Sequence, residues 1–143
     1  MNVASILNEK GRAVITARED VSLADIVEIL ARRRIGAVVI VDAADRAVGI
    51  VSERDIIRRL ARDGAVCLSE NVRGTMTREL VTGTLGDTLD DLTTKMSEGR
   101  FRHLPIVSQD GLCGIVSASD VVKFRAAEVE MEAESLRSYI ATG

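Results

Sequence analysis

The segments GIVSERD at 49–55 and GIVSASD at 114–120 place a serine and an aspartate at the same spacing twice in one chain. In each motif an apolar run leads into the start of an expected helix, where free N–H groups attract anions. An aspartate one turn into the helix suits a ribose, whose adjacent hydroxyls can donate to its carboxylate, and a serine can donate to a phosphate. The pairs Ser52/Asp55 and Ser117/Asp120 are therefore candidates for holding a phosphorylated sugar.

The same residue types also have a purely structural interpretation. A serine followed three residues later by an aspartate fits a capping box, which satisfies the first N–H groups of a helix. The glycine of each motif would then only permit a bend in the strand. A similar capping pattern occurs at 22–25 and 88–91, without the preceding glycine and strand. On residue types alone, both interpretations stay open.

The two motifs belong to an internal repeat. Gly114 lies 65 residues after Gly49, and Thr82 lies 66 residues after Thr16. VASIL at 3–7 resembles VRGTM at 72–76, with three extra residues following in the first copy. Each copy has the pattern strand, helix, strand, strand, helix. The short first strands are expected at 13–16 and 80–83, and the buried middle strands at 37–41 and 104–107.

This order predicts an α/β (α+β) fold of two β-α-β-β-α repeats packed about a pseudo-two-fold axis. A three-stranded sheet with helices on one face leaves its other face open, so one copy alone would be marginal. We expect the first repeat at 1–66, the second at 67–125 and a helical extension at 126–143, fused into one globular unit. Apolar residues recur every seven positions in the long C-terminal helix: Val122, Val129 and Leu136, and Ala126, Ala133 and Ile140. So narrow a stripe suits packing on another helix, of the same repeat or of a second subunit.

Composition excludes several classes of function. The net charge is −3 and aromatic residues make up only 2% of the chain, so a dedicated nucleic-acid binder is not expected. No stretch of about 18 apolar residues and no signal-peptide pattern is present, and we expect a cytoplasmic protein. The two cysteines fit reduced thiols there, and neither is given a role.

With these motifs in place, the chain resembles a tandem pair of cystathionine-β-synthase (CBS) domains, also called a Bateman module. The resemblance covers residues 3 to about 125. It rests on the two GIVSxxD motifs, on RRIGAVVIVD and RFRHLPIVSQDG, and on the segment 75–96. The tail is similar to that of small bacterial stand-alone pairs. The resemblance implies homodimers and adenosine-containing ligands: AMP, ADP or ATP, sometimes NAD(H) or S-adenosylmethionine.

The resemblance also implies roles for single residues of the two motifs. Asp55 and Asp120 match the aspartates that bind ribose in the family. Ser52, Ser117 and Ser119 match hydroxyls near the ribose and the phosphate. These matches favour the ligand interpretation of the motifs over the capping interpretation, without excluding the caps.

Basic side chains distinguish the two copies. Arg54 stands where the family often has a basic side chain that contacts the phosphate. The second copy has Ser119 at this position. Arg102 and His103 match the family's basic pair just before the middle strand. A lone histidine is more often an ordinary surface or hydrogen-bonded residue, but its neighbour and the family match favour phosphate contact. A metal site is not expected, because His103 is the only histidine.

Small residues and hydroxyls complete the candidate set. Gly36 and Ala37 stand where the second copy has its basic pair, and they suit close approach of an adenine ring with Ile35 beside it. Thr16 and Thr82, at the ends of the first strands, match residues that line the cleft from the opposite repeat. The cleft of the second motif would then combine its own basic pair with small residues of the other copy. We expect it to be the better nucleotide site.

The sequence therefore predicts a non-catalytic regulatory module. It would bind an adenosine-containing ligand in clefts between the repeats and transmit the signal to an effector protein. The sequence does not choose among AMP, ADP, ATP and NAD(H). Two alternatives stay open: a structural dimerisation or adaptor protein with vestigial clefts, and a hydrolase or transferase. The absence of clustered His, Cys or paired acids speaks against the last.

Overall fold

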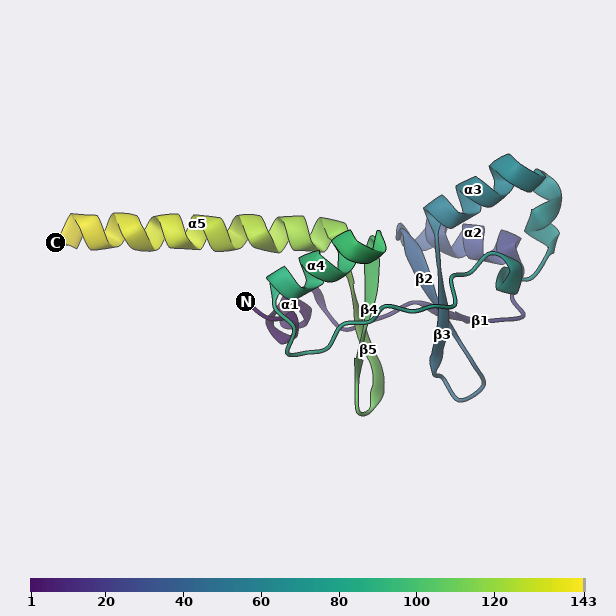
Figure 1. The fold of residues 1–143 in the computed structure, drawn as a ribbon, viewed down its shortest axis with the longest axis horizontal. Helices are drawn as coiled ribbons and strands as arrows, with labels where there is room; N and C mark the ends of the chain where they lie inside the picture. The colour runs from purple at the N-terminus through teal and green to yellow at the C-terminus, as the bar shows by residue number, and fades with distance from the viewer. Residues whose placement is uncertain (143) are drawn as a thin grey trace. The chain divides into compact units, whose positions relative to one another are not determined.

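A computed structural model describes residues 1–142 of the chain (Figure 1). These residues form two compact units. Unit 1 contains residues 1–12, 81–109 and those from 113 onward, and unit 2 contains residues 13–80 and 110–112. The first helix of the chain therefore packs with the second half of the sequence.

Unit 2 is built around a three-stranded sheet with the order β1-β2-β3. Strand β1 runs parallel to β2, and β2 runs antiparallel to β3. Every residue of the Val- and Ile-rich strand β2 is buried, as expected of a central strand. The elements of unit 2 are β1 (Thr16–Arg18), α2 (Leu23–Arg33), β2 (Ala37–Val41), β3 (Ala47–Ser52), α3 (Glu53–Asp63) and the short 3-10 helices η1 (Ala65–Ser69) and η2 (Val72–Gly74).

The spacing of Leu23, Ile26, Val27 and Leu30 predicts one buried face for α2, and the structure confirms it with one exception. Leu23, Ile26 and Leu30 are buried in the core of unit 2. Val27, predicted on the same stripe, is 38% exposed, and Ile29 packs against the core in its place. The buried face is therefore rotated toward the side of Ile29.

Unit 1 combines a two-stranded sheet, β4-β5, with helices from both ends of the chain. Its elements are α1 (Val3–Lys10), α4 (Leu89–Gly99), β4 (His103–Ser108), β5 (Gly111–Ser117) and α5 (Ala118–Thr142). The apolar positions expected in α4, Leu89, Leu92 and Met96, are buried. They share one core with Ile6 and Leu7 of α1. Within residues 1–142, no helix combines the length and the apolar character needed to cross a membrane.

The first strand of each copy differs from the prediction. In unit 2, β1 covers Thr16–Arg18 instead of 13–16, so Thr16 begins this strand and does not end it. Its register follows from the parallel pairing of Thr16 with Val39. In unit 1 the segment 80–83 forms only an isolated parallel bridge between Gly83 and Ile106.

Pro105 accounts for one of the two strand pairings that unit 1 lacks. The corresponding residue of unit 2, Val39, donates its backbone N–H to the carbonyl of Ile15 at 3.3 Å. A proline has no N–H to donate at this position. The bridge keeps two bonds, from Gly83 N to Pro105 O at 2.9 Å and from Val107 N to Gly83 O at 3.0 Å. The missing donor thus removes the pairing equivalent to that of Thr16 with Val39, but it does not account for the missing equivalent of Arg18 with Val41.

Candidate functional site

The junction of β3 and α3 positions the first predicted motif. Ser52 is the N-cap of α3, and its Oγ accepts a hydrogen bond from the backbone N–H of Asp55 at 3.3 Å. The Asp55 Oδ2 atom accepts two bonds, from the Ser52 backbone N–H and from the Ser52 hydroxyl, both at 2.9 Å. The capping interpretation is therefore confirmed at this motif. Asp55 Oδ1 takes part in none of these contacts.

The junction of β5 and α5 repeats this cap and adds a cation. Asp120 Oδ2 accepts from the Ser117 backbone N–H at 2.9 Å, and Ser117 Oγ accepts from the Asp120 N–H at 3.1 Å. Lys10, the last residue of α1, donates from Nζ to Asp120 Oδ2 at 2.6 Å and to the carbonyl of Ile115 at 2.7 Å. The carboxylate side chain is 21% exposed and the lysine side chain 25%. Unit 1 thus holds a partly buried ion pair at its predicted ribose-binding residue.

The ion pair sets the protonation state of Asp120. Burial alone would raise the pKa of this carboxyl group, because a desolvated carboxylate is less stable. The hydrogen bond from Lys10, the bond from the Ser117 N–H and the lysine charge outweigh that effect and lower the pKa below its usual value. Asp120 is therefore an ionised acceptor at neutral pH. Its Oδ1 atom takes part in none of the contacts described above, so it is the oxygen that could accept from a ligand hydroxyl.

Sequence analysis did not identify Lys10 as a site residue. Lys10 and Asp120 are 110 residues apart in the chain. The available signal was the set of three extra residues after VASIL, which extends α1 as far as Lys10. The counterpart of α1 in unit 2, η2, ends at Gly74, before the equivalent position.

The glycine of each motif has a packing role in addition to the predicted bend. A Cβ atom on Gly114 would lie 2.6 Å from Leu7 Cδ1, and one on Gly49 would lie 2.8 Å from Met76 Sδ. Such distances are too short for carbon in contact with carbon or sulfur, so any larger residue would force the side chain of Leu7 or Met76 to shift. In unit 1 this contact seats α1 on β5 and thereby positions Lys10.

The segment before each middle strand is tied to the start of the helix that follows the motif. Glu53 N donates to Gly36 O at 3.0 Å, and Ala118 N donates to Arg102 O at 2.7 Å. These two bonds are equivalent in the repeat. In unit 2 this bond holds the backbone of Gly36 and Ala37 next to the β3–α3 junction. In unit 1 the equivalent bond holds the backbone of Arg102 and His103 next to the β5–α5 junction.

The candidate residues divide between the two units. Ser52, Asp55 and Gly36 are half-buried, Ala37 is buried and Arg54 is exposed. Ala37 pairs with Ser52 across the β2–β3 ladder, which brings the small residues beside the first motif. The set of unit 2 is Thr16, Ile35, Gly36, Ala37, Ser52, Arg54 and Asp55, and the set of unit 1 is Thr82, Arg102, His103, Ser117, Ser119 and Asp120.

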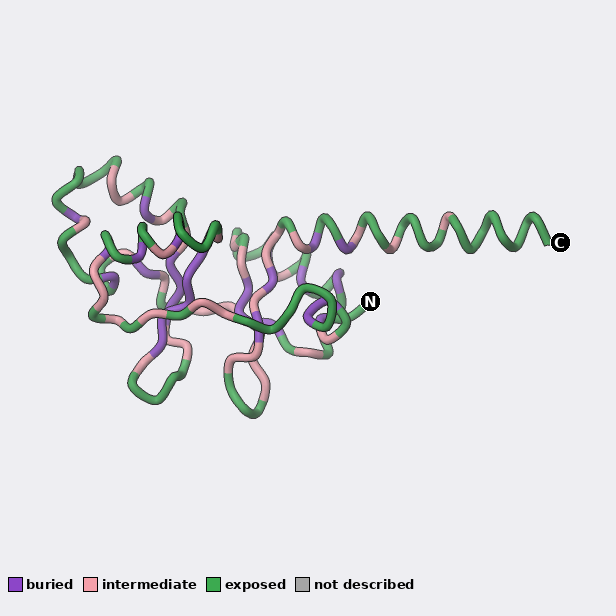
Figure 2. The backbone as a smooth tube through the Cα atoms, turned by 180° about the vertical axis from the view of Figure 1, so that it is seen from behind, coloured by how far each residue is buried: buried purple, intermediate pink, exposed green. Residues whose placement is uncertain are grey.

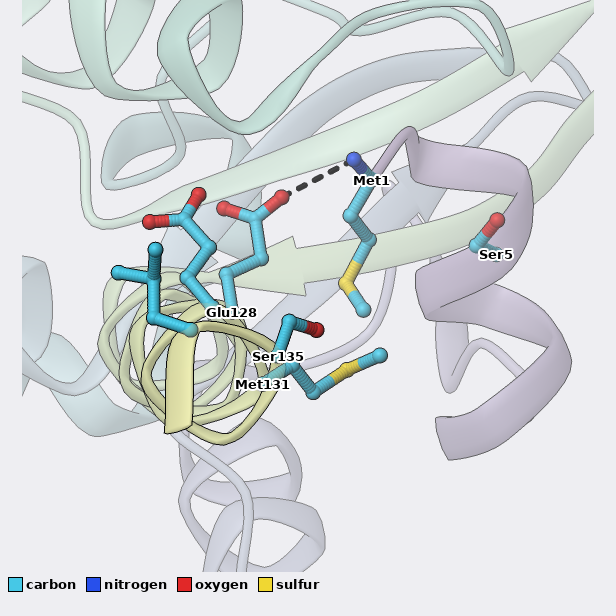
Figure 3. A pocket seen from close by; sticks show the side chains of 7 residues that line it. Met1, Ser5, Glu128, Met131 and Ser135 are labelled. Carbon is cyan, nitrogen blue, oxygen red and sulfur yellow. Dashed lines mark hydrogen bonds and ion pairs between the residues drawn. The ribbon is translucent and has the colours of Figure 1, made fainter. Parts of the chain in front are cut away.

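A groove of about 760 Å³ in unit 1 lies apart from these residues. It runs between the start of the chain and α5, and Met1, Ser5, Met131 and Leu136 are among its lining residues (Figure 3). The N-terminal ammonium group bonds to Glu128 Oε1 at 3.0 Å on its wall. None of the predicted ligand residues lines this groove. Among residues 1–142, no cluster of His, Cys, Asp or Glu could hold a metal ion.

Comparison with known proteins identifies the family. The family model of the CBS domain matches residues 4–62 and again residues 70–127. The chain belongs to the CBS-domain family and carries two copies of the domain. A solved CBS-domain containing protein from Agrobacterium tumefaciens is 40% identical, with a TM-score of 0.85 over 87% of this chain and 99% of that chain. The predicted family and the α/β fold class are thus confirmed.

Other relatives extend the comparison. The CBS domain pair of protein MJ0100, solved with 5′-methylthioadenosine and S-adenosyl-L-methionine, is 26% identical, with a TM-score of 0.79 over 90% of this chain and 98% of that chain. A curated relative from Methanocaldococcus jannaschii, uncharacterized protein MJ1225, is 29% identical over 85% of this chain. The Arabidopsis thaliana mitochondrial protein CBSX3 is 28% identical over 99% of it. The chain spans 45% of MJ1225 and 72% of CBSX3.

Proposed function

We propose that this chain is a non-catalytic regulatory module that binds an adenosine-containing ligand, with Asp120 holding the ribose. The observation that carries the proposal is the state of the Asp120 carboxylate. It is ionised, partly exposed and held at a helix N-terminus, with Oδ1 outside the capping bonds. The adenosine derivatives bound to the MJ0100 pair, a relative at 26% identity, support the class of ligand.

The charges of unit 1 suit a ligand that also carries a phosphate. Lys10 is 25% exposed beside Asp120, and Arg102 is exposed at the segment tied to the start of α5. His103 follows Arg102 as the first residue of β4. We propose that these cations, together with the hydroxyls of Ser117 and Ser119, receive the phosphate end of AMP, ADP, ATP or NAD(H).

The set of unit 2 would form a second, different site. Asp55 carries the same cap as Asp120, and its basic neighbour is Arg54. We propose that Asp55, Ser52 and Arg54 hold sugar and phosphate there. Thr16 and Thr82 stay predicted to line the cleft of the opposite repeat, and Ile35, Gly36 and Ala37 to contact an adenine ring. The combination of residues from both repeats in one cleft stays a prediction, as do the repeat boundaries 1–66 and 67–125 and the extension 126–143.

Regulation would follow from a shift in population. A ligand that binds one conformation of the chain more tightly increases its share, and an effector protein that contacts that conformation responds. The effector protein, the homodimer implied by the family and the cytoplasmic location are parts of this proposal.

A structural or adaptor role is the second candidate, and one observation favours it. The capping bonds of Ser52 and Asp55, and those of Ser117 and Asp120, account for both motifs without any ligand. In that case the carboxylates would only stabilise helix starts.

Calorimetric titration of the full chain with AMP, ADP, ATP, NADH and S-adenosylmethionine separates the two candidates. We expect at least one ligand to bind, and Asp120→Asn to weaken it about tenfold or more, because loss of a charged acceptor removes about 1.5–3 kcal/mol. Asp91→Asn is the matched control, since Asp91 closes a capping box of the same kind at the start of α4 and is not a predicted ligand residue. Absence of binding by every ligand would favour the adaptor. Turnover of a nucleotide that disappears in Asp120→Ala would favour an enzyme.

A further inference from the structure

Helix α5 has two apolar faces, which meet at Leu136, a residue that also lines the groove described above. One face packs on its own unit: Val121 and Phe124 are buried, and Met131 continues this side as a wall of the groove described above. The other face is the seven-residue stripe predicted from the sequence. At about 100° per residue, the stripe lies roughly 130° around the helix from the packed face. The stripe is Val122, Ala126, Val129, Ala133, Leu136 and Ile140, and we call it the α5 seam.

The α5 seam is open over most of the helix, although Ala133 is half-buried and Leu136 also lines the groove. Val122 is 70% exposed, Val129 58%, Leu136 62% and Ile140 75%. Figure 2 shows α5 exposed over most of its length, in contrast to its first turns against unit 1. An apolar stripe that alternates in steps of four and three is the pattern of a two-stranded coiled coil. A seam this regular and this exposed indicates that a second helix packs on it.

The charges beside the seam indicate which helix that is. In coiled-coil terms Val122, Val129 and Leu136 take d positions and the other seam residues take a positions. Arg125 and Glu132 then lie at g positions, and Glu130 and Arg137 at e positions. In a parallel pair in register, each g residue faces the e residue five positions later on the other helix.

A second copy of the chain satisfies this rule at both places. Arg125 of one helix would face Glu130 of the second copy, and Glu132 would face Arg137 of the second copy. The two-fold symmetry of a parallel pair doubles both contacts. An antiparallel pair centred near Glu130 would instead bring Glu130 against its own counterpart, because e positions then face e positions. Arg125, already bonded to Asp90 and Glu128 in its own chain, keeps a side chain that is 41% exposed.

We propose that two copies of this chain associate through the α5 seam, as a parallel pair of helices in register. The proposal specifies a surface for the homodimer of the proposed function and does not depend on a ligand. Residues 128–142 lie beyond the CBS family match, which ends at 127. Most of the seam is therefore a property of this chain's own tail. The acidic residues Glu128, Glu130, Glu132 and Glu134 would repel an anionic lipid surface.

Sedimentation equilibrium of the full chain over a wide concentration range tests the surface. We expect a dimer, and Val129→Glu should raise its dissociation constant about tenfold or more, because two carboxylates would be buried at the seam. Met131→Glu is the matched control: Met131 is 63% exposed on α5 but lies away from the seam, so the dimer should persist. A monomer at all concentrations, or a dimer unaffected by Val129→Glu, would overturn the proposal.

Cross-linking tests the orientation. Equivalent d positions of a parallel pair lie within reach of a disulfide, so Leu136→Cys should give a covalent dimer on mild oxidation. Ser138→Cys, two residues further on and off the seam, should not, nor should the unaltered chain with Cys67 and Cys113. Equal cross-linking of Leu136→Cys and Ser138→Cys, or cross-linking of neither, would contradict the parallel register.

A charge reversal tests the pairing itself. Arg137→Glu should weaken the dimer, because Glu132 would face a carboxylate, and Glu132→Arg in the same chain should restore it. Failure of the second change to restore the dimer would overturn the assigned register. Nucleotide titration of Val129→Glu separates this proposal from the previous one, since a monomeric variant that still binds ligand leaves the proposed function intact.

Discussion

The two strand–helix junctions share one motif and one cap but differ in charge. At both, a serine caps the helix and an aspartate three residues later bonds back to the serine backbone. Only Asp120 also binds a lysine, which comes from the end of α1. The corresponding element of unit 2, η2, ends without such a residue. The repeated motif thus gives both junctions the same backbone structure. Helix α1, which lies outside the motif, makes the two junctions chemically different.

The contact that packs α1 against β5 also has an equivalent in unit 2. Leu7 of α1 fills the space above Gly114, as Met76 fills the space above Gly49. Helix α1 is an eight-residue α-helix and η2 a three-residue 3-10 helix. The extra length of α1 carries Lys10 to Asp120. The predictions that follow alter first the shared contact, then the lysine, then the strand that unit 1 lacks.

The largest effect is expected for Gly114→Val. The new side chain would overlap Leu7, which is 1% exposed and has little room to move. We expect a loss of about 3 kcal/mol in the free energy of unfolding, measured by urea denaturation. Gly86→Val is the control, because nothing lies within 4 Å of a Cβ atom there. Equal losses of unfolding free energy in the two variants would show that α1 and β5 are not tightly packed at Gly114.

Lys10→Met should remove the ion pair of unit 1 at a cost of about 1 kcal/mol near neutral pH, since both groups are only partly exposed. The pKa of Asp120 is lowered in the folded chain, so its contribution is present above the unfolded value of about 3.9 and is lost as the pH falls through the folded value. The stability difference from the unaltered chain should therefore shrink below about pH 4. A difference that is constant from pH 7 to pH 3 would contradict the ion pair as its cause. In an Asp120→Asn background the effect should be smaller at all pH values.

Pro105→Val should have the smallest effect. It restores an N–H at the position where Val39 donates to Ile15 in unit 2. We expect a change of no more than about 1 kcal/mol in the free energy of unfolding, the net value of one hydrogen bond. Amide hydrogen exchange is the more sensitive measurement, and the new valine amide should be protected. An unprotected amide would show that the proline is not what prevents the pairing equivalent to that of Thr16 with Val39.

The repeat and its motifs were predictable from the sequence because they depend on local spacing. The strand–helix order, the caps at Ser52 and Ser117 and the buried face of α4 all follow from patterns a few residues long. The placement of α1 in unit 1 and the pairing of Lys10 with Asp120 depend on contacts between distant segments, which periodicity does not encode. The exposure of Val27 has the same origin, since the neighbouring sheet decides which side of an amphipathic helix is covered.

The effect of Pro105 was predictable only in part. Its missing N–H follows from the residue type alone. Its consequence, the loss of one pairing with the neighbouring segment, depends on how many other bonds the pair keeps, which only the structure shows.

Binding of a nucleotide and of its 2′,3′-dideoxy analogue, measured by calorimetry in the unaltered chain and in Asp120→Asn, tests most directly whether Asp120 holds a ribose. The account predicts that the unaltered chain prefers the nucleotide with both hydroxyls by about tenfold or more, and that Asp120→Asn loses most of this preference. The same preference in both proteins would contradict it, because the hydroxyls would then be bound by some other residue.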